Sequence, residues 1–369
     1  MKFDRRLFLN FDWTLLILVL LISSIGLLNI YSTGYSLADF KQSHLYIKQV
    51  QWIFIGLACM GVAFCIDYRL ISGYAYIIYA FSLLLLIGVF LYGDAAHGSQ
   101  RWIVIGGFSF QPSELVKLTM ILALARYFDV HKTDKGYSLR ELFVPFLIVV
   151  IPFLFILKQP DLGTALILVI LFLSIVLFVG VEWKSLLCAA AGCVVLIPVG
   201  WHFLKDYQKE RIVTFFSPEK DFLGSGYHII QSIIAVGSGQ ILGKGFLKGT
   251  QTQLKFLPVQ QTDFVFSVFS EEWGFLGGLI LIIMFLILVL WCLKIGLHAR
   301  DLVGTLISFG ITMLIFWEVF INIGMVLGML PVVGIPLPFL SYGGSSIVVL
   351  LTGIGLLMSI SMRRFILRP

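Results

Sequence analysis

Charged side chains inside apolar segments are the residues of this sequence best suited to chemistry. Such groups are costly to bury in a membrane, so each is expected to be paired or functional. Glu114 and Lys117 stand three residues apart, which places them on one face of a helix. Two interpretations are open: an ion pair that neutralises both, or a site where Lys117 meets an anionic ligand and Glu114 orients it. The preceding Gln111-Pro112-Ser113 predicts a helix start, whose free N–H groups suit a phosphate.

A third acid, Asp263, stands where a long polar segment becomes apolar, in the run Thr262-Asp263-Phe264. Its carboxylate could cap a helix, because the dipole at a helix N-terminus favours negative charge. A carboxylate at this boundary is equally suited to act as a general base or as a ligand of a divalent cation such as Mg²⁺ or Mn²⁺. No organic cofactor is expected, because the Walker and dinucleotide-binding motifs are absent from the sequence.

Two non-helical segments are candidates to surround the same site. In the turn at residues 158–161 we favour Asp161 as a helix cap, while Lys158 and Gln159 project towards an outer cavity. Residues 331–345 contain three prolines and a Gly-Gly pair, so their backbone is expected to line a cavity at membrane depth. The candidate binding residues of this second segment are Ser341, Tyr342, Gly343, Gly344 and Ser345.

Two further polar pairs lie deeper in apolar runs. Glu271 and Glu272 follow Asp263 by about two helical turns, and we expect one to face a cavity and the other to be paired or to lie near an edge. Glu318 and Asn322 stand four apart on one helical face, where we favour hydrogen bonds between helices.

The elements that position these side chains are membrane helices. Apolar residues make up 59% of the chain and charged residues 12%, with a mean hydropathy of +0.99, whereas soluble domains carry about twice that charge. We expect an all-α, polytopic membrane protein of about ten transmembrane helices, forming a single domain over residues 1–369. The candidate spans are Trp13–Tyr31, Tyr46–Ile66, Leu70–Tyr92, Ser113–Phe128, Leu142–Leu157, Gly163–Gly180, Lys184–Phe203, Phe264–Leu293, Leu302–Leu327 and Ser345–Met362.

The charge distribution orients these helices. If the N-terminus is cytoplasmic, most Lys and Arg of the short loops fall on the cytoplasmic side, as the positive-inside rule requires. Both termini are then cytoplasmic, and the long segment 205–263, between the seventh and eighth spans, lies outside as an ordered loop that re-enters or follows the membrane surface. The net charge of +6 is not gathered into a patch with aromatics, so nucleic acid is not an expected partner.

Five motifs follow one another along nearly the whole chain: Gln111-Pro112-Ser113-Glu114 with Lys117, Gln159-Pro160-Asp161-Leu162-Gly163-Thr164, Gln231-Ser232, Thr262-Asp263-Phe264 and Pro338-Phe339-Leu340-Ser341-Tyr342-Gly343-Gly344-Ser345-Ser346. In sequence and order they resemble the motifs of the SEDS (shape, elongation, division and sporulation) family. Within the family, residues 243–251 and 254–258 are more similar to the RodA branch than to the FtsW branch.

The resemblance implies a peptidoglycan glycosyltransferase of cell-wall elongation in the bacterial cytoplasmic membrane. It implies lipid II and an undecaprenyl-pyrophosphate-linked glycan as substrates, polymerised at the outer face. It also implies a class B penicillin-binding protein, a transpeptidase, and other elongation-complex membrane proteins as partners. The family's essential acid maps to Asp263. On this basis Lys117, Arg101 and Arg211 are candidates to offset the pyrophosphate charge.

Two other functions compete with this interpretation. A flippase of lipid-linked precursors also needs a groove and buried charges, although no transporter-type repeat is visible and Asp263 lies towards the outer surface. A non-catalytic scaffold for a transpeptidase would tolerate changes at Asp263.

Overall fold

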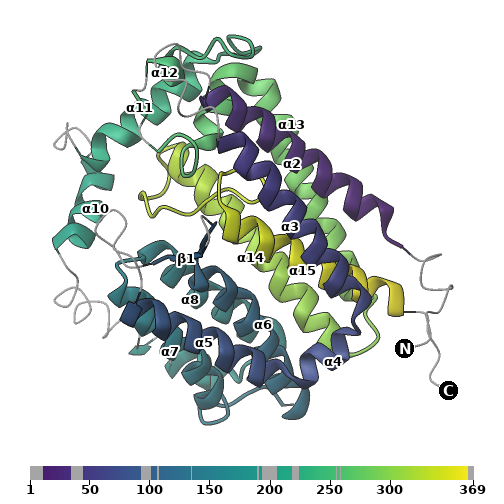
Figure 1. The fold of residues 1–369 in the computed structure, drawn as a ribbon. Coiled ribbons are helices and arrows are strands. Elements are labelled where there is room, and N and C mark those ends of the chain that lie inside the picture. The colour runs from purple at the N-terminus through teal and green to yellow at the C-terminus, as the bar shows by residue number, and fades with distance from the viewer. Residues whose placement is uncertain are drawn as a thin grey trace.

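The computed structural model describes residues 11–34, 45–92, 101–105, 108–133, 135–188, 191–192, 206–217, 224–254, 256–257 and 259–364. These residues form a bundle of helices with one short hairpin (Figure 1). The helices are α2 (Trp13–Gly34), α3 (Leu45–Cys65), α4 (Tyr68–Gly73), α5 (Ala75–Tyr92), α6 (Pro112–Val130), α7 (Phe143–Lys158), α8 (Leu162–Val179), α10 (Asp206–Phe216), α11 (Ser225–Ser238), α12 (Thr250–Gln253), α13 (Val265–Leu297), α14 (Leu302–Val326) and α15 (Gly344–Arg363).

Six helices of the described part are long and apolar enough to cross a membrane, so the chain is a multi-pass membrane protein. These six are α2, α3, α8, α13, α14 and α15. Helices also lie where we expected the third, fourth and fifth spans, but the third is broken at Tyr74 into α4 and α5. The expected seventh span, Lys184–Phe203, lies largely outside the described residues.

Glycines let the central helix α15 pack closely against α3. A Cβ on Gly56 would lie 2.5 Å from the Leu351 side chain, and one on Gly355 would lie 2.4 Å from the Met60 carbonyl oxygen. Small residues at helix contacts are typical of membrane bundles, where close packing replaces the hydrophobic effect. Because α15 is buried along nearly its whole length, the bundle is organised around it.

The all-α expectation missed a short antiparallel hairpin. Strands β1 (Ile103–Ile105) and β2 (Phe108–Phe110) pair Ile103 with Phe110. Each strand has only three residues, which is too short for the alternation of side chains to be recognised in the sequence. The hairpin leads directly into α6, so it helps to fix the start of that helix.

The expected ordered loop before α13 contains three helices in its described part, α10, α11 and α12, gathered at one end of the bundle (Figure 1). Residues 239–245 of this loop enter a break in α13 at Gly274, whose φ of 67° and ψ of −167° are not helical. The loop supplies the hydrogen bonds that the break removes from the helix. These bonds are Phe275 N to Gln240 O (2.8 Å), Leu276 N to Ile241 O (3.1 Å), Lys244 N to Glu271 O (3.0 Å) and Gly245 N to Glu272 O (3.0 Å).

Replacing Gly274 is therefore expected to destabilise the protein. In Gly274→Ala the new Cβ would lie 2.2 Å from Gly243 N, and a positive φ disfavours alanine, so a loss of about 1–3 kcal/mol is expected from the backbone alone. Gly88→Ala is the matched control, since a Cβ there meets nothing within 4 Å inside α5. The free energy of unfolding in detergent measures both, and equal stability of the two variants would contradict this account of the break.

Candidate active site

A cavity of about 270 Å³ opens at the end of the bundle where α6, α8 and α13 begin. Charged and polar side chains from six separate segments converge on it. Its lining includes Arg101, Trp102, Gln111, Glu114, Pro160, Asp161, Thr164, Arg211, Thr262, Asp263, Gly334, Tyr342, Gly343 and Ser345. The structure thus brings together eight of the predicted site residues. Two of them, Arg101 and Ser345, are 244 positions apart in the chain.

Asp263 lies just before α13 and does not cap it. The residue at the cap position is Phe264, and no side chain there accepts a hydrogen bond from the helix. The Asp263 carbonyl oxygen accepts a 2.9 Å hydrogen bond from Asn322 Nδ2, which fixes the backbone beside the cavity. A Cβ on Gly334 would lie 3.3 Å from Asp263 Oδ2, so a glycine there leaves the carboxylate room. The interpretation of Asp263 as a plain helix cap is therefore wrong.

Burial raises the pKa of Asp263 above its ordinary value. The hydrogen bond from Thr262 and the positive charges of Arg211 and Arg101 lower this pKa, while the negative charge of Asp161 raises it. Desolvation is the largest of these effects, and it disfavours the charged carboxylate. A carboxyl group with a raised pKa accepts a proton more readily than an ordinary aspartate, which suits a general base.

The turn between α7 and α8 holds Arg101 in place. Arg101 Nε donates a 2.8 Å hydrogen bond to the Gln159 carbonyl oxygen, and a second guanidinium nitrogen donates to the Pro160 carbonyl oxygen. Arg211 reaches the cavity from α10. Two guanidinium groups at one cavity are suited to bind phosphate groups.

Asp161 caps α8, as we favoured, and also lines the cavity. Its carboxylate accepts hydrogen bonds from Thr164 N (3.3 Å) and Thr164 Oγ1 (2.9 Å). Gln111 Nε2 donates a third, at 3.1 Å, and so connects this turn to the start of α6. Asp161 is consequently satisfied by its protein neighbours.

Lys117 does not line the cavity but lies beneath it. Its side chain is 2% exposed, and Nζ is 2.8 Å from Glu114 Oε1 and 2.5 Å from Glu318 Oε1. Of the two interpretations of Lys117, this geometry matches the internal ion pair, with a second carboxylate that the spacing on one helix could not reveal. Glu114 is the member of this ion triad that reaches the cavity.

Four other candidates stand behind the lining. Gln159 is buried and donates a 3.4 Å hydrogen bond to the Leu86 carbonyl oxygen, and Lys158 is likewise absent from the lining. Ser341 Oγ donates to the Thr262 carbonyl oxygen at 2.5 Å, and Gly344 packs against the Trp52 ring. These residues support the cavity wall, and their contact with a ligand stays a prediction.

Neither Glu271 nor Glu272 lines this cavity, because the loop before α13 binds both. Glu271 accepts hydrogen bonds from Lys244 Nζ (2.7 Å) and Gln251 N (3.0 Å). Glu272 accepts hydrogen bonds from Ser32 Oγ and from Leu247 N, the latter at 3.2 Å. The pair fastens the loop to α13, so the expectation that one of the two faces a cavity is not met at this site.

Sequence reasoning missed the role of Asn322. Its Nδ2 donates to the Asp263 carbonyl oxygen and, at 2.7 Å, to the Ile335 carbonyl oxygen. The expected hydrogen bond between helices is not what Asn322 makes, because its partners are carbonyl groups of two non-helical segments that border the cavity. Its spacing from Glu318 was the available signal, and that spacing cannot identify a backbone partner.

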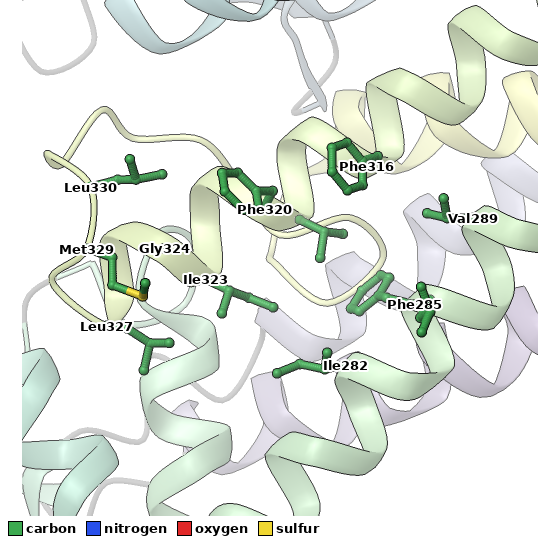
Figure 2. A pocket seen from close by; sticks show the side chains of 12 residues that line it. Ile282, Phe285, Val289, Phe316, Phe320, Ile323, Gly324, Leu327, Met329 and Leu330 are labelled. Carbon is green, nitrogen blue, oxygen red and sulfur yellow. The ribbon is translucent and has the colours of Figure 1, made fainter.

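A second cavity, of about 380 Å³, is an apolar groove between α13 and α14 (Figure 2). Phe285 and Val289 of α13 face Phe316 and Phe320 of α14 across it. No titratable group is among the residues described around it, so this groove offers a surface for apolar chains and no chemistry.

Comparison with known proteins assigns the family. Residues 12–365 match the FtsW/RodA/SpoVE family, described as cell cycle proteins. This chain belongs to that family. Peptidoglycan glycosyltransferase MrdB of Escherichia coli (strain K12) is 38% identical over 356 residues, which cover 96% of this chain and 94% of the relative. Peptidoglycan glycosyltransferase RodA of Treponema pallidum (strain Nichols) is 34% identical, with 96% and 98% covered.

Solved structures agree with this assignment. A structure titled "Structural coordination of polymerization and crosslinking by a peptidoglycan synthase complex" contains a chain that matches with a TM-score of 0.81 and 31% identity, covering 96% of this chain and 98% of that one. The crystal structure of rod shape determining protein RodA of Thermus thermophilus matches with a TM-score of 0.69 and 28% identity, with the same coverage. The described helices therefore form the RodA fold.

The ion triad generates a prediction about stability. Lys117→Met would leave two buried carboxylates without their cation, and breaking such a pair costs about 3–5 kcal/mol. Lys132→Met is the matched control, because the Lys132 side chain is 59% exposed and its ion pair with Asp129 contributes at most about 1 kcal/mol. The free energy of unfolding in detergent should be lower for Lys117→Met than for Lys132→Met. Equal losses of this free energy would show that the ion pairs of Lys117 do not stabilise the protein.

Proposed function

We propose that this protein polymerises lipid II into peptidoglycan glycan strands, as a peptidoglycan glycosyltransferase of cell-wall elongation. Curated relatives named peptidoglycan glycosyltransferase align over nearly the full chain. The observation that carries the proposal is the cavity itself, where the Asp263 carboxylate lies with two guanidinium groups, Arg101 and Arg211. A transfer that releases a pyrophosphate needs both parts, a base for the attacking hydroxyl and cations for the leaving group.

The proposed chemistry is one displacement at the anomeric carbon of the donor sugar. Asp263 takes the proton of the acceptor hydroxyl while the hydroxyl oxygen forms a bond to that carbon. The bond between this carbon and the pyrophosphate oxygen breaks, and undecaprenyl pyrophosphate leaves with the electron pair. Arg101 and Arg211 stabilise the negative charge that develops on the pyrophosphate. A single displacement inverts the anomeric centre without a covalent intermediate.

A divalent cation is the second proposal for Asp263. Mg²⁺ is commonly held by one or two carboxylates together with substrate phosphates, and such an ion neutralises phosphate charge. Asp263 fits this arrangement, because Asp161 and Glu114 are engaged with protein groups. Within the described residues no group of three His, Cys, Asp or Glu side chains could hold a metal without a ligand's help.

The same proposal places the cavity at the outer face of the bacterial cytoplasmic membrane. Both termini are then cytoplasmic, and the loop 205–263 is extracytoplasmic. The distribution of Lys and Arg in the short loops supports this orientation. We further propose a class B penicillin-binding protein, with other elongation-complex membrane proteins, as partners, since the matched chain of the peptidoglycan synthase complex belongs to an assembly that polymerises and crosslinks.

Asp263→Asn tests the function directly. It keeps the shape of the side chain but removes the base, so we expect polymer formation from purified lipid II to fall by about 100-fold or more. Asp129→Asn, at the other end of α6, is the control and should polymerise normally. Normal polymer from Asp263→Asn would rule out the base, and movement of labelled lipid across sealed vesicles without polymer would favour a flippase.

The raised pKa of Asp263 predicts the pH dependence. Asp263 acts as a base only when ionised, so the rate should fall as pH decreases through this raised pKa. The acid limb should consequently lie above the ordinary aspartate value of about 3.9. Arg211→Gln removes a charge that lowers the pKa of Asp263, so it should move the limb to still higher pH. Polymerisation rates measured about every half pH unit between roughly pH 4 and 8 give the position of this limb. A rate that does not change with pH would contradict the role of Asp263.

The same assay, run with a chelator or with the transpeptidase added, tests the remaining proposals. If Asp263 binds a divalent cation, removal of divalent metal should abolish polymer and Mg²⁺ or Mn²⁺ should restore it. Full activity with chelator would leave Asp263 as a base alone. Addition of the transpeptidase should raise the polymerisation rate if the partner activates the enzyme, and an unchanged rate would argue against such activation.

A further inference from the structure

Helix α15 begins at the cavity with three backbone donors that have no acceptor within the helix. These N–H groups, of Gly344, Ser345 and Ser346, precede the first intrahelical hydrogen bond, from Ile347 N to the Gly343 carbonyl oxygen at 3.1 Å. The cap residue Gly343 has no side chain to accept from them, and the first turn carries no acidic residue. Gly343, Ser345 and Ser346 all line the cavity, so the positive end of α15 faces it.

Acidic side chains stand at the starts of the other helices that begin at this cavity. Asp161 caps α8, Glu114 lies in the first turn of α6, and Asp263 directly precedes the cap residue of α13. An anion at any of these three starts meets a carboxylate. Among the described helices that begin at the cavity, the start of α15 is thus the one suited to bind an anion.

Ser346 is an independent sign that a ligand binds at the start of α15. The residue is 9% exposed and lines the cavity. No described residue forms a hydrogen bond with its hydroxyl. Ser345 beside it differs, because its Oγ accepts from Gln111 N at 2.8 Å and donates to the Ser109 carbonyl oxygen at 3.5 Å. Buried polar groups are normally paired, so the Ser346 hydroxyl is suited to a partner that enters the cavity.

Gly343 leaves space next to this hydroxyl. A Cβ on Gly343 would meet only the Ser346 Cβ within 4 Å, at 3.6 Å, which is an ordinary contact. The φ of Gly343 is −178°, an extended conformation that any residue adopts. Gly344 differs, because a Cβ there would lie 2.1 Å from the Trp52 ring. Packing therefore requires glycine at 344, whereas glycine at 343 keeps the volume beside Ser346 open.

Hydrogen bonds hold the start of α15 next to Asp263. Tyr342 N donates to the Gln261 carbonyl oxygen at 2.8 Å, and Ser341 Oγ donates to the Thr262 carbonyl oxygen at 2.5 Å. The two residues before Gly343 are thus joined to the two residues before Asp263. A phosphate bound at the start of α15 would consequently lie beside the segment that carries the proposed base.

We propose that Ser346, the space at Gly343 and the free N–H groups at the start of α15 form a site for one phosphate group of the lipid-linked pyrophosphate. This inference rests on the function proposed above and deepens it. The site adds neutral donors to the guanidinium groups of Arg101 and Arg211, which line the same cavity. Backbone donors at a helix start are fixed in place, so they stabilise charge on a leaving phosphate without reorganising.

Ser346→Ala tests the hydroxyl. It removes one hydrogen bond to a charged group, so the dissociation constant of inorganic pyrophosphate should rise about 10-fold, and KM for lipid II should rise with it. Calorimetry on the purified protein measures the first quantity without turnover. Ser308→Ala is the matched control, because Ser308 Oγ on α14 is also buried without a hydrogen-bond partner but does not line the cavity. Pyrophosphate affinity equal to that of the parent protein in both variants would overturn the proposal.

Two further variants test charge and space. Ser346→Asp places a carboxylate at the third position of α15, where it favours the helix but repels an anion, so pyrophosphate affinity should fall about 100-fold or more in a folded protein. Gly343→Ala adds a methyl group beside Ser346. It should weaken pyrophosphate binding while the free energy of unfolding in detergent stays at the parent value. Unchanged pyrophosphate affinity in Ser346→Asp would show that no anion binds at the start of α15.

The parent protein separates failure of this site from failure of the proposed function. No binding of inorganic pyrophosphate by the parent protein would overturn the phosphate site, even if lipid II were polymerised. Pyrophosphate binding that depends on Ser346, together with no polymer from lipid II, would overturn the proposed function and leave the phosphate site in place.

Discussion

Polar contacts between distant segments hold the apolar bundle together around the cavity, and Asn322 and Glu318 on one face of α14 make three of them. Asn322 donates to the Asp263 carbonyl oxygen and to the Ile335 carbonyl oxygen, which joins the start of α13 to the loop before α15. One turn earlier, Glu318 holds Lys117 of α6. Unsatisfied polar groups are expensive in lipid, so these contacts fix three elements with respect to one another. The cavity is the space that they leave.

The break in α13 joins the loop before α13 to the same helix that begins beside Asp263. Residues 239–245 replace the hydrogen bonds lost at Gly274, and the Glu271 carboxylate receives Lys244 and the start of α12. The segment of α13 between Asp263 and Gly274 is therefore held at both ends, by Asn322 and by the loop. These contacts restrict movement of the backbone next to the Asp263 side chain. Such restriction matters for a reacting group, because small displacements of it reduce the rate strongly.

Long apolar runs made the helices predictable, whereas exceptions within them depend on tertiary contacts. The helix with Glu114 was expected because a helix-start motif precedes a continuous apolar run, and α6 confirms the helix, although no side chain caps its start. The break at Gly274 was not, because it exists only where the distant residues 239–245 enter the helix. The hairpin at β1 and β2 was also missed, since three residues carry too little pattern.

Sequence reasoning named eight residues that line the cavity, but five others that it named lie outside the lining. Spacing placed Glu114 beside Lys117, and the structure confirms that pair. Spacing could not place Glu318 on Lys117, because 201 positions separate them. Nor could it distinguish a cap from a free carboxylate at Asp263, which depends on how Phe264 enters α13. The family resemblance supplied the substrate, which neither spacing nor the shape of the cavity identifies.

The central claim is that the polar cavity binds the pyrophosphate of a lipid-linked glycan beside Asp263. A structure of the protein with lipid II bound tests it most directly. The account predicts pyrophosphate oxygens within hydrogen-bonding distance of Arg101 and Arg211, with a sugar hydroxyl or the anomeric carbon next to the Asp263 carboxylate. A pyrophosphate that lies away from these arginines, with the sugar outside the cavity, would contradict it.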